Sequence, residues 1–322
     1  MRVLLLCLCL LLAACESHIS DTVNSDKQVS SLPLESGPYL IVLGTSQDAG
    51  SPQIGCQKAC CRDLFDNPDH SRKVTSLGVI DPVSGTSYLF EATPDIGTQL
   101  QVLQQWSGKR EPIPDAIFLT HAHIGHYTGL QFLGKEAINA QEAAVYAMPR
   151  MQDYLRTNGP WGQLVTNRNI TIRSLKADSV MVLSPRLSVR PFLVPHRDEY
   201  SETVGYEITG PNKKVLFIPD IDKWERWDRD ISELVKGVDR AYVDATFFDG
   251  EELDTRDISQ VPHPFVIESM SRFDKLPADI RAGVHFIHFN HTNTLLDTLS
   301  PNYKQVIEAG YGVARYGDRF EL

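Results

Sequence analysis

The chain has 322 residues, of which 42% are hydrophobic and 22% charged, and its formal net charge is −10. These proportions are typical of a globular protein and exclude the collagen-like, coiled-coil and disordered classes. The acidic balance also argues against a nucleic-acid partner, because phosphate backbones are bound by clusters of Lys and Arg that this chain lacks. The histidines are the unusual feature: eight of the ten lie from His121 onward.

The first residues contain one Arg, an apolar run over 3–12 and small residues before Cys15, a pattern typical of a secretory signal. The run is shorter than the roughly 20 apolar residues that span a bilayer. The letters LAAC resemble the lipobox of bacterial lipoproteins, in which the cysteine is acylated. We therefore expect residues 1–15 to be a lipoprotein signal. The product would be exported and anchored to a membrane through Cys15, in the periplasm or at the cell surface. The alternative is a plain signal peptide.

The segment 16–37 is polar, rich in Ser and Asp and without apolar period, which predicts a flexible tether. No repeat or Pro- and Gly-rich linker divides the sequence after it, so we expect one mixed α/β domain over 38–322. A sheet core flanked by helices fits the alternating patterns. The predicted strands are 39–44, 75–80, 86–91, 116–120, 187–194, 204–208, 215–218, 241–243 and 284–289, and the predicted helices are 96–106, 129–139, 150–158, 224–235, 264–273 and 302–309.

Three cysteines remain after the signal, namely Cys56, Cys60 and Cys61 within GCQKACC. An odd number fits a disulfide framework poorly in an oxidising compartment. Their close spacing is compatible with a metal site. The alternative is one vicinal or short-loop disulfide with one free thiol.

The strongest motif is AIFLTHAHIGHYTGL, residues 116–130, in which His121, His123 and His126 follow a predicted strand. Histidines at positions i and i+2 after a strand end can direct two imidazoles at one ion, and zinc favours such nitrogen ligands. Three histidines within so short a segment are unusual in a core or on a surface. The segment therefore predicts a metal site.

This motif resembles that of the metallo-β-lactamase fold superfamily, His-x-His-x-Asp-His after a strand. The resemblance implies an α/β (α+β) fold, a four-layer αββα sandwich. It also implies that His121 and His123 bind a first metal ion and that His126 binds a second. The family's Asp is replaced here by Gly125, which offers no ligand, so the resemblance leaves the second position short of a carboxylate.

The resemblance also implies three further metal ligands in chain order, each at the end of a predicted strand. His196, in FLVPHRDEY, matches the third histidine of the first metal position. Asp220, in VLFIPDIDKW, matches the carboxylate that bridges both positions, and it is expected to orient the attacking water. His288, in GVHFIHFNHTN, matches the last histidine of the second position. Taken singly, His196 is as readily a loop residue and Asp220 a helix N-cap.

The opening LGTSQDAGSPQIGCQKACC resembles a narrower branch, which contains the phosphonate-pathway cyclic phosphodiesterase and pyrroloquinoline quinone biosynthesis protein B. That branch carries a structural zinc on a cysteine loop, completed by a histidine three residues after the last active-site histidine. The resemblance implies a structural site of Cys56, Cys60, Cys61 and His291, with Lys58 at the branch's middle cysteine.

Three other side chains are candidates. His263, in VPHPFV, lies where related phosphodiesterases keep a histidine that protonates the leaving group, although a loop histidine between two prolines is the alternative. Asp244 ends a predicted strand and would orient a ligand histidine or cap a turn. Asp48 is the one nearby carboxylate that would substitute for the missing Asp at Gly125.

Three functions fit these observations. The first is a metal-dependent hydrolase of a phosphodiester or cyclic ester, with one catalytic and one structural zinc and a small-molecule substrate; iron or manganese are alternatives at the histidines. The second is an iron protein of an oxidative step, as the resemblance to the quinone-biosynthesis protein implies. The third is a non-catalytic binding lipoprotein that lost hydrolysis with the Asp at Gly125.

Overall fold

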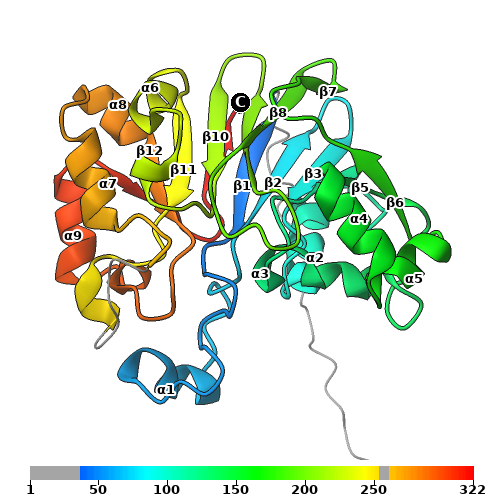
Figure 1. The fold of residues 1–322 in the computed structure, drawn as a ribbon, viewed down its shortest axis with the longest axis horizontal. Coiled ribbons are helices and arrows are strands. Elements are labelled where there is room, and N and C mark those ends of the chain that lie inside the picture. Colours follow the sequence, from blue (N-terminus) through cyan, green and yellow to red (C-terminus); the bar gives the residue numbers. More distant parts are fainter. Residues whose placement is uncertain (1–36, 254–260) are drawn as a thin grey trace, which may run out of the picture. The chain divides into compact units, whose positions relative to one another are not determined.

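The computed structural model describes residues 37–253 and 261–322. Two seven-stranded mixed sheets pack face to face, and helices cover the outer face of each sheet (Figure 1). This is the predicted four-layer αββα sandwich. The expected signal with Cys15 and the tether, apart from Gly37, lie outside the described residues. None of the helices in the described ranges has the length and apolar character needed to cross a bilayer.

Each sheet is half antiparallel and half parallel. The first runs β14-β1-β2-β3-β4-β5-β6 and is parallel from β3 to β6; the second runs β13-β12-β11-β10-β9-β8-β7 and is parallel from β13 to β10. The strands of the first sheet are β1 (Tyr39–Gly44), β2 (Ser76–Asp81), β3 (Thr86–Phe90), β4 (Ala116–Phe118), β5 (Ala143–Ala147), β6 (Ile170–Ser174) and β14 (Arg319–Glu321). Those of the second are β7 (Met181–Ser184), β8 (Leu187–Leu193), β9 (Val204–Thr209), β10 (Lys214–Ile218), β11 (Arg240–Asp244), β12 (Val284–Ile287) and β13 (Gly312–Val313).

The helices divide between the two outer layers, except for α1, which lies on a long excursion of the chain after β1 (Figure 1). Four α-helices follow strands of the first sheet and four follow strands of the second. The α-helices are α1 (Ala59–Asp66), α2 (Ile96–Ser107), α3 (Ile124–Tyr127), α4 (Pro149–Thr157), α5 (Trp161–Thr166), α6 (Ile231–Lys236), α7 (Val266–Phe273), α8 (Ala278–Gly283) and α9 (Pro301–Glu308). Short 3-10 helices are η1 (Thr128–Leu133), η2 (Trp224–Arg226), η3 (Gly250–Leu253) and η5 (Thr294–Leu296).

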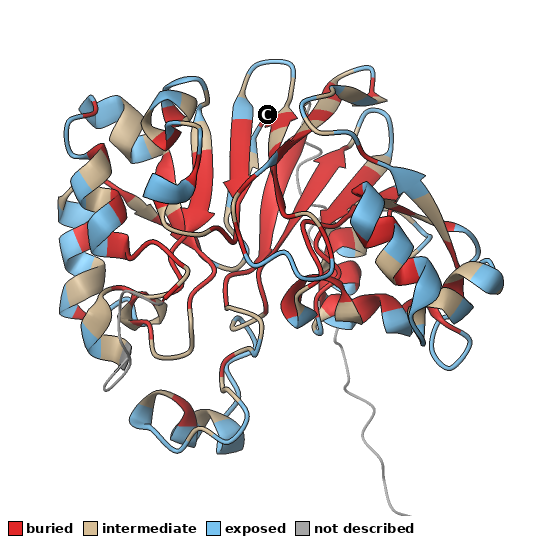
Figure 2. Ribbon diagram, in the orientation of Figure 1, coloured by how far each residue is buried: buried red, intermediate tan, exposed pale blue. Residues whose placement is uncertain are grey.

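The apolar core has three layers, and strand β1 shows why. Leu40 and Val42 belong to the cluster between the sheets, whereas Ile41 and Leu43 face the helices of the first outer layer. Because side chains alternate along a strand, a strand covered on both faces reads as a continuous apolar run. Figure 2 shows the result, with strands buried and the outer helix faces exposed.

Two predicted helices were wrong in extent. The pattern over 129–139 forms only the 3-10 helix η1, which ends before Gly134. The pattern over 224–235 is broken into η2 and α6, because the Asp230 side chain accepts a hydrogen bond from the Ser232 amide and begins a new helix there. Strands β5, β6, β7, β13 and β14 and helices α1, α3, α5 and α8 were not predicted.

Candidate metal centre

The predicted ligands follow strands of both sheets and come together in the structure. His121, His123, His196 and Asp220 form a first group, in which one donor atom of each lies within 4.8 Å of the others. Asp220 Oδ2 lies 3.1 Å from His196 Nε2 and 3.3 Å from His121 Nε2, and His123 Nδ1 lies 3.3 Å from His196 Nε2. His121, His196 and Asp220 are buried, whereas the His123 side chain is 15% exposed at the rim.

A second group contains Asp48, His126, Asp220 and His288, so Asp220 belongs to both. His126 Nε2 lies 2.9 Å from Asp48 Oδ1 and 3.8 Å from Asp220 Oδ2, and His288 Nε2 lies 3.5 Å from Asp48 Oδ1. His126 and His288 are fully buried. The site can therefore hold two neighbouring cations that share the Asp220 carboxylate.

Three neighbours orient the imidazole rings. The Thr120 hydroxyl lies 2.9 Å from His121 Nδ1, and the Thr246 hydroxyl lies 3.0 Å from His288 Nδ1. Glu91 is buried, and its Oε1 lies 3.4 Å from His126 Nδ1. Each contact occupies the Nδ1 atom of the ring and leaves the Nε2 atom for the metal centre. Residues that support metal-binding histidines contact the non-ligating nitrogen in this way.

The hydrogen bonding of the donor atoms shows whether the centre suits a metal. His121 Nε2, His126 Nε2 and His288 Nε2 are buried and make no hydrogen bond of good geometry among the described residues, and the same holds for Asp48 Oδ1 and Asp220 Oδ1. Each of these atoms lies within 3.5 Å of an acid or imidazole of the same centre. A buried polar atom left unpaired costs about 1–3 kcal/mol. Nitrogen and carboxylate donors in this number are the ligand types that zinc and similar cations take. The residues fit a metal.

Charge couples the acids and the imidazoles of the centre. Burial alone would raise the pKa of Asp220, but the charges of His196 and His263 outweigh it and hold the pKa well below the usual value. Asp48 behaves in the same way, with His126 as its main partner. Burial and the neighbouring His126 lower the pKa of His121, so this ring is neutral. Ionised carboxylates and a neutral His121 suit metal ligation. Burial alone would lower the pKa of His196 and His126, but neighbouring carboxylates outweigh it and raise the pKa of His196 to about 9 and that of His126 well above its usual value, so a cation bound there would displace a proton from each of these two rings.

The structure also places His263 and Asp244 at the centre. His263 is buried, and its Nδ1 lies 2.9 Å from Asp244 Oδ2 and 3.2 Å from Asp220 Oδ1. Burial alone would lower the pKa of His263, but the two carboxylates outweigh it and raise the pKa to about 10. Asp244 is fixed in turn by the amides of Ile221 and Thr246, which donate to its two oxygens. The two carboxylates thus hold His263 by Nδ1 and favour its protonated form.

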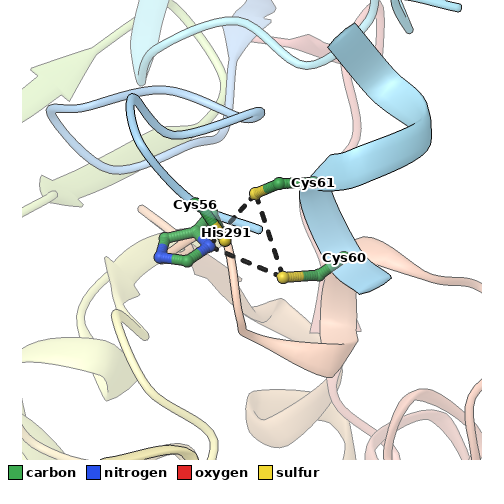
Figure 3. A group of neighbouring side chains, drawn as sticks. All are labelled: Cys56, Cys60, Cys61 and His291. Carbon is green, nitrogen blue, oxygen red and sulfur yellow. Dashed lines mark hydrogen bonds between the residues drawn. The ribbon is translucent and has the colours of Figure 1, made fainter. Parts of the chain in front are cut away.

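The cysteine cluster forms a separate site (Figure 3). Cys56, Cys60, Cys61 and His291 have donor atoms within 4.8 Å of one another. Cys60 and Cys61 Sγ lie 3.9 Å apart, and His291 Nδ1 lies 3.6 Å and 3.3 Å from them. Tetrahedral zinc, with bonds of about 2.3 Å to sulfur and 2.0 Å to nitrogen, separates its ligands by about 3.5–3.8 Å.

The three cysteines are free thiols, so the alternative of a vicinal or short-loop disulfide is not present in the structure. Burial and the neighbouring Cys61 and Cys56 sulfurs raise the pKa of Cys60 to about 12. The sulfurs therefore favour the thiol form, and a cation bound among them would let them act as thiolate ligands. The cluster fits a structural metal.

Comparison with known proteins places the chain in a family. A model described as "Beta-lactamase superfamily domain" matches residues 86–286, more than half of the chain, so the chain belongs to this superfamily. Coenzyme PQQ synthesis protein B of Pseudomonas syringae pv. tomato is 26% identical over 309 residues, which cover 88% of this chain and 100% of that protein. The protein of the same name from Pseudomonas putida KT2440 has the same identity and coverage.

Solved structures show the same fold. Zn²⁺-bound PqqB from Methylobacterium extorquens has a TM-score of 0.73 and 23% identity, and the match covers 88% of this chain and 100% of that one. A diphosphatase of the PhnP family has a TM-score of 0.60 and 21% identity, covering 88% and 97%. In this chain, the clusters of His, Asp and Cys are the groups that could hold a metal.

Sequence reasoning missed Glu91 and Asp222. Glu91 follows β3 directly and is buried in the structure. The signal available in the sequence was an acidic residue at the end of an apolar predicted strand. Asp222 Oδ1 lies 3.6 Å from His196 Nδ1, on the side of the ring away from Asp220, but one more acidic residue in PDIDKW carries no local signal. His288 also has a φ of 69°, a strained conformation for a non-glycine residue that no pattern predicts.

Proposed function

We propose that the chain is a metal-dependent hydrolase that acts on a phosphodiester or a cyclic ester of a small molecule. The observation that carries the proposal is the group of His121, His123, His196 and Asp220, three of them buried, whose donor atoms lie within 4.8 Å of one another. Zinc held there with an open coordination position would lower the pKa of a water towards 7 and polarise a phosphoryl or carbonyl oxygen.

The chain's own residues supply the remaining steps. Asp220, whose Oδ1 lies 3.2 Å from His263 Nδ1, would orient a water for attack. Asp244 holds Nδ1 of His263 at 2.9 Å and keeps the ring protonated at neutral pH. His263 Nε2 would then donate its proton to the departing oxygen as a general acid. The partly exposed His123 marks the side from which a substrate enters.

The test is turnover and metal content of the full chain loaded with zinc, on panels of phosphodiesters and lactones. His123→Ala should lose both a zinc ion and turnover, because a ligand is gone. His263→Gln should keep the metal and lose turnover about 100-fold, because only the proton donor is gone. His70→Ala, at an exposed loop position, is the control. Full activity of His123→Ala would overturn the proposal.

The names of the curated relatives favour a second candidate, a protein of PQQ synthesis. We propose for this candidate the iron-dependent oxidative step that the sequence resemblance implies. Three histidines and one aspartate also hold Fe(II). Iron in the purified protein together with oxygen-dependent turnover would put this candidate first. For the location we propose an exported lipoprotein anchored through Cys15, which rests on the sequence of residues 1–15.

A further inference from the structure

The second metal group contains a carboxylate from an unexpected part of the chain. Asp48 lies in the loop after β1, far in sequence from the histidine motif, yet its Oδ1 is 2.9 Å from His126 Nε2 and 3.5 Å from His288 Nε2. Its side chain is only 11% exposed, and its buried Oδ1 faces these two imidazole nitrogens without a hydrogen bond of good geometry among the described residues. A carboxylate oxygen in this state is poised for a cation.

Asp48 occupies the space beside Gly125. A Cβ atom added at Gly125 would lie 2.4 Å from Asp48 Oδ1 and 2.5 Å from Asp48 Cα. Both separations are far below van der Waals contact, and the second involves the backbone, so rotating the Asp48 side chain cannot relieve the clash. Any residue other than glycine at position 125 would push the Asp48 loop away from the histidines.

The backbone around Asp48 is held in place by the loop that carries His288. The amide of Gln47 donates to the carbonyl of Phe289 at 2.7 Å, and the amide of Phe289 donates to the carbonyl of Thr45 at 2.7 Å. Farther along the same excursion, the Cys60 and Cys61 sulfurs lie beside His291. The excursion is thus fixed on both sides of Asp48 to the segment that follows β12.

We propose that Asp48 is a ligand of a second metal ion, together with His126, His288 and the shared Asp220, and that Gly125 is the position that makes room for it. Two imidazole nitrogens and two carboxylate oxygens suit zinc, and also iron or manganese. The carboxylate that the motif lacks at position 125 comes from a different loop. The inference rests on the histidine site holding metal, as the proposed function does, but not on hydrolysis.

The experiment compares the zinc content of the full chain with that of Asp48→Asn and Gly125→Ala, after equilibration with zinc and removal of the excess. We expect about three ions per wild-type chain, counting two at the histidines and one at the cysteines, and about two in each variant. Asp48→Asn keeps the side-chain shape and removes the charge. Gly125→Ala removes no ligand atom and acts only through the displaced loop.

Two matched controls are available. Asp66→Asn changes an exposed carboxylate of the same excursion, and Gly97→Ala adds a Cβ to a helical glycine with nothing within 4 Å. Both should keep about three ions. Asp48→Ala serves if Asp48→Asn fails to fold: a folded Ala variant with about two ions supports the proposal, and one that keeps about three overturns it.

The outcomes separate this inference from the proposed function, because zinc content is read without turnover. A wild-type chain with only two ions, or an Asp48→Asn chain that keeps three, would overturn the ligand role of Asp48 and leave hydrolysis standing. A Gly125→Ala chain that keeps three ions would overturn the role of Gly125. A chain that loses one ion in both variants but hydrolyses nothing would sustain the inference and overturn the proposed function.

Discussion

His285 provides a quantitative test of the fold that is independent of the metal centre. It lies in β12 with its ring against the backbone of Gly312, where an added Cβ would be 2.3 Å from His285 Nε2. Burial first, and then the charge of Arg240, lower the pKa of His285 from 6.5 to about 4, although the ring also hydrogen-bonds the Gly283 carbonyl. The folded protein therefore keeps this imidazole neutral where the unfolded chain protonates it.

The direction of the pH effect on stability follows from the linkage between proton binding and folding. Because the pKa of His285 is lower in the folded state, its contribution to stability is present above pH 6.5 and is lost as the pH falls towards 4. The full loss is at most about 3 kcal/mol, and about 1.3 kcal/mol of it falls between about pH 7.5 and about pH 5.5. That difference is measurable by urea unfolding at the two pH values.

The perturbation is His285→Asn, whose side-chain amide can replace the Nδ1 hydrogen bond to Gly283 but does not titrate. We expect the free energy of unfolding of wild type to fall by about 1.3 kcal/mol more than that of the variant over this pH range. His70→Asn, at an exposed position, is the control and should follow wild type. Equal pH dependence of wild type and His285→Asn would refute the reasoning.

Two further predictions concern single contacts. Tyr206→Phe removes the hydroxyl that donates to the Leu119 carbonyl at 2.5 Å while keeping the ring packed against Phe90, so the free energy of unfolding should fall by about 1–3 kcal/mol in urea titrations. Unchanged stability would show that the buried hydrogen bond contributes nothing. Cys61→Ser should lose one zinc ion per chain by elemental analysis and lower the Tm, because the Cys61 sulfur lies 3.3 Å from His291 Nδ1. Wild-type zinc content in Cys61→Ser would contradict a metal at the cysteines.

The fold was predictable where burial imposes a plain pattern. Strand β1 is covered on both faces and its range was predicted to the residue, whereas β5, with the sequence AAVYA, is rich in alanine and gives little β signal. β6 and β7 form the outer edges of their sheets and contain half-exposed residues, so their apolar pattern is weak. The local sequence of such a strand does not show which other strand it will pair with.

The centre was predictable for a different reason. The spacing of His121, His123 and His126 is local, and the remaining ligands were found because the resemblance supplied their order. The supporting contacts had no such guide: Glu91 and Asp222 are single acidic residues whose meaning depends on which ring the fold brings to them. Asp48 could be suspected as a loop carboxylate, but its exclusion of a side chain at Gly125 is visible only in three dimensions.

The energetics of the centre argue that the histidines still serve as a metal site. Buried donor atoms without a hydrogen bond of good geometry among the described residues, such as His121 Nε2 and His288 Nε2, each cost up to about 1–3 kcal/mol, and the left-handed backbone of His288 adds about 1–3 kcal/mol of strain. Such terms are large against the stability of a whole domain, about 5–15 kcal/mol. If the chain no longer bound metal, substitution of any one ligand would remove such an unfavourable term. Their joint presence, with Asp48 fitted against Gly125, is explained if bound cations satisfy these atoms and thereby stabilise the folded chain.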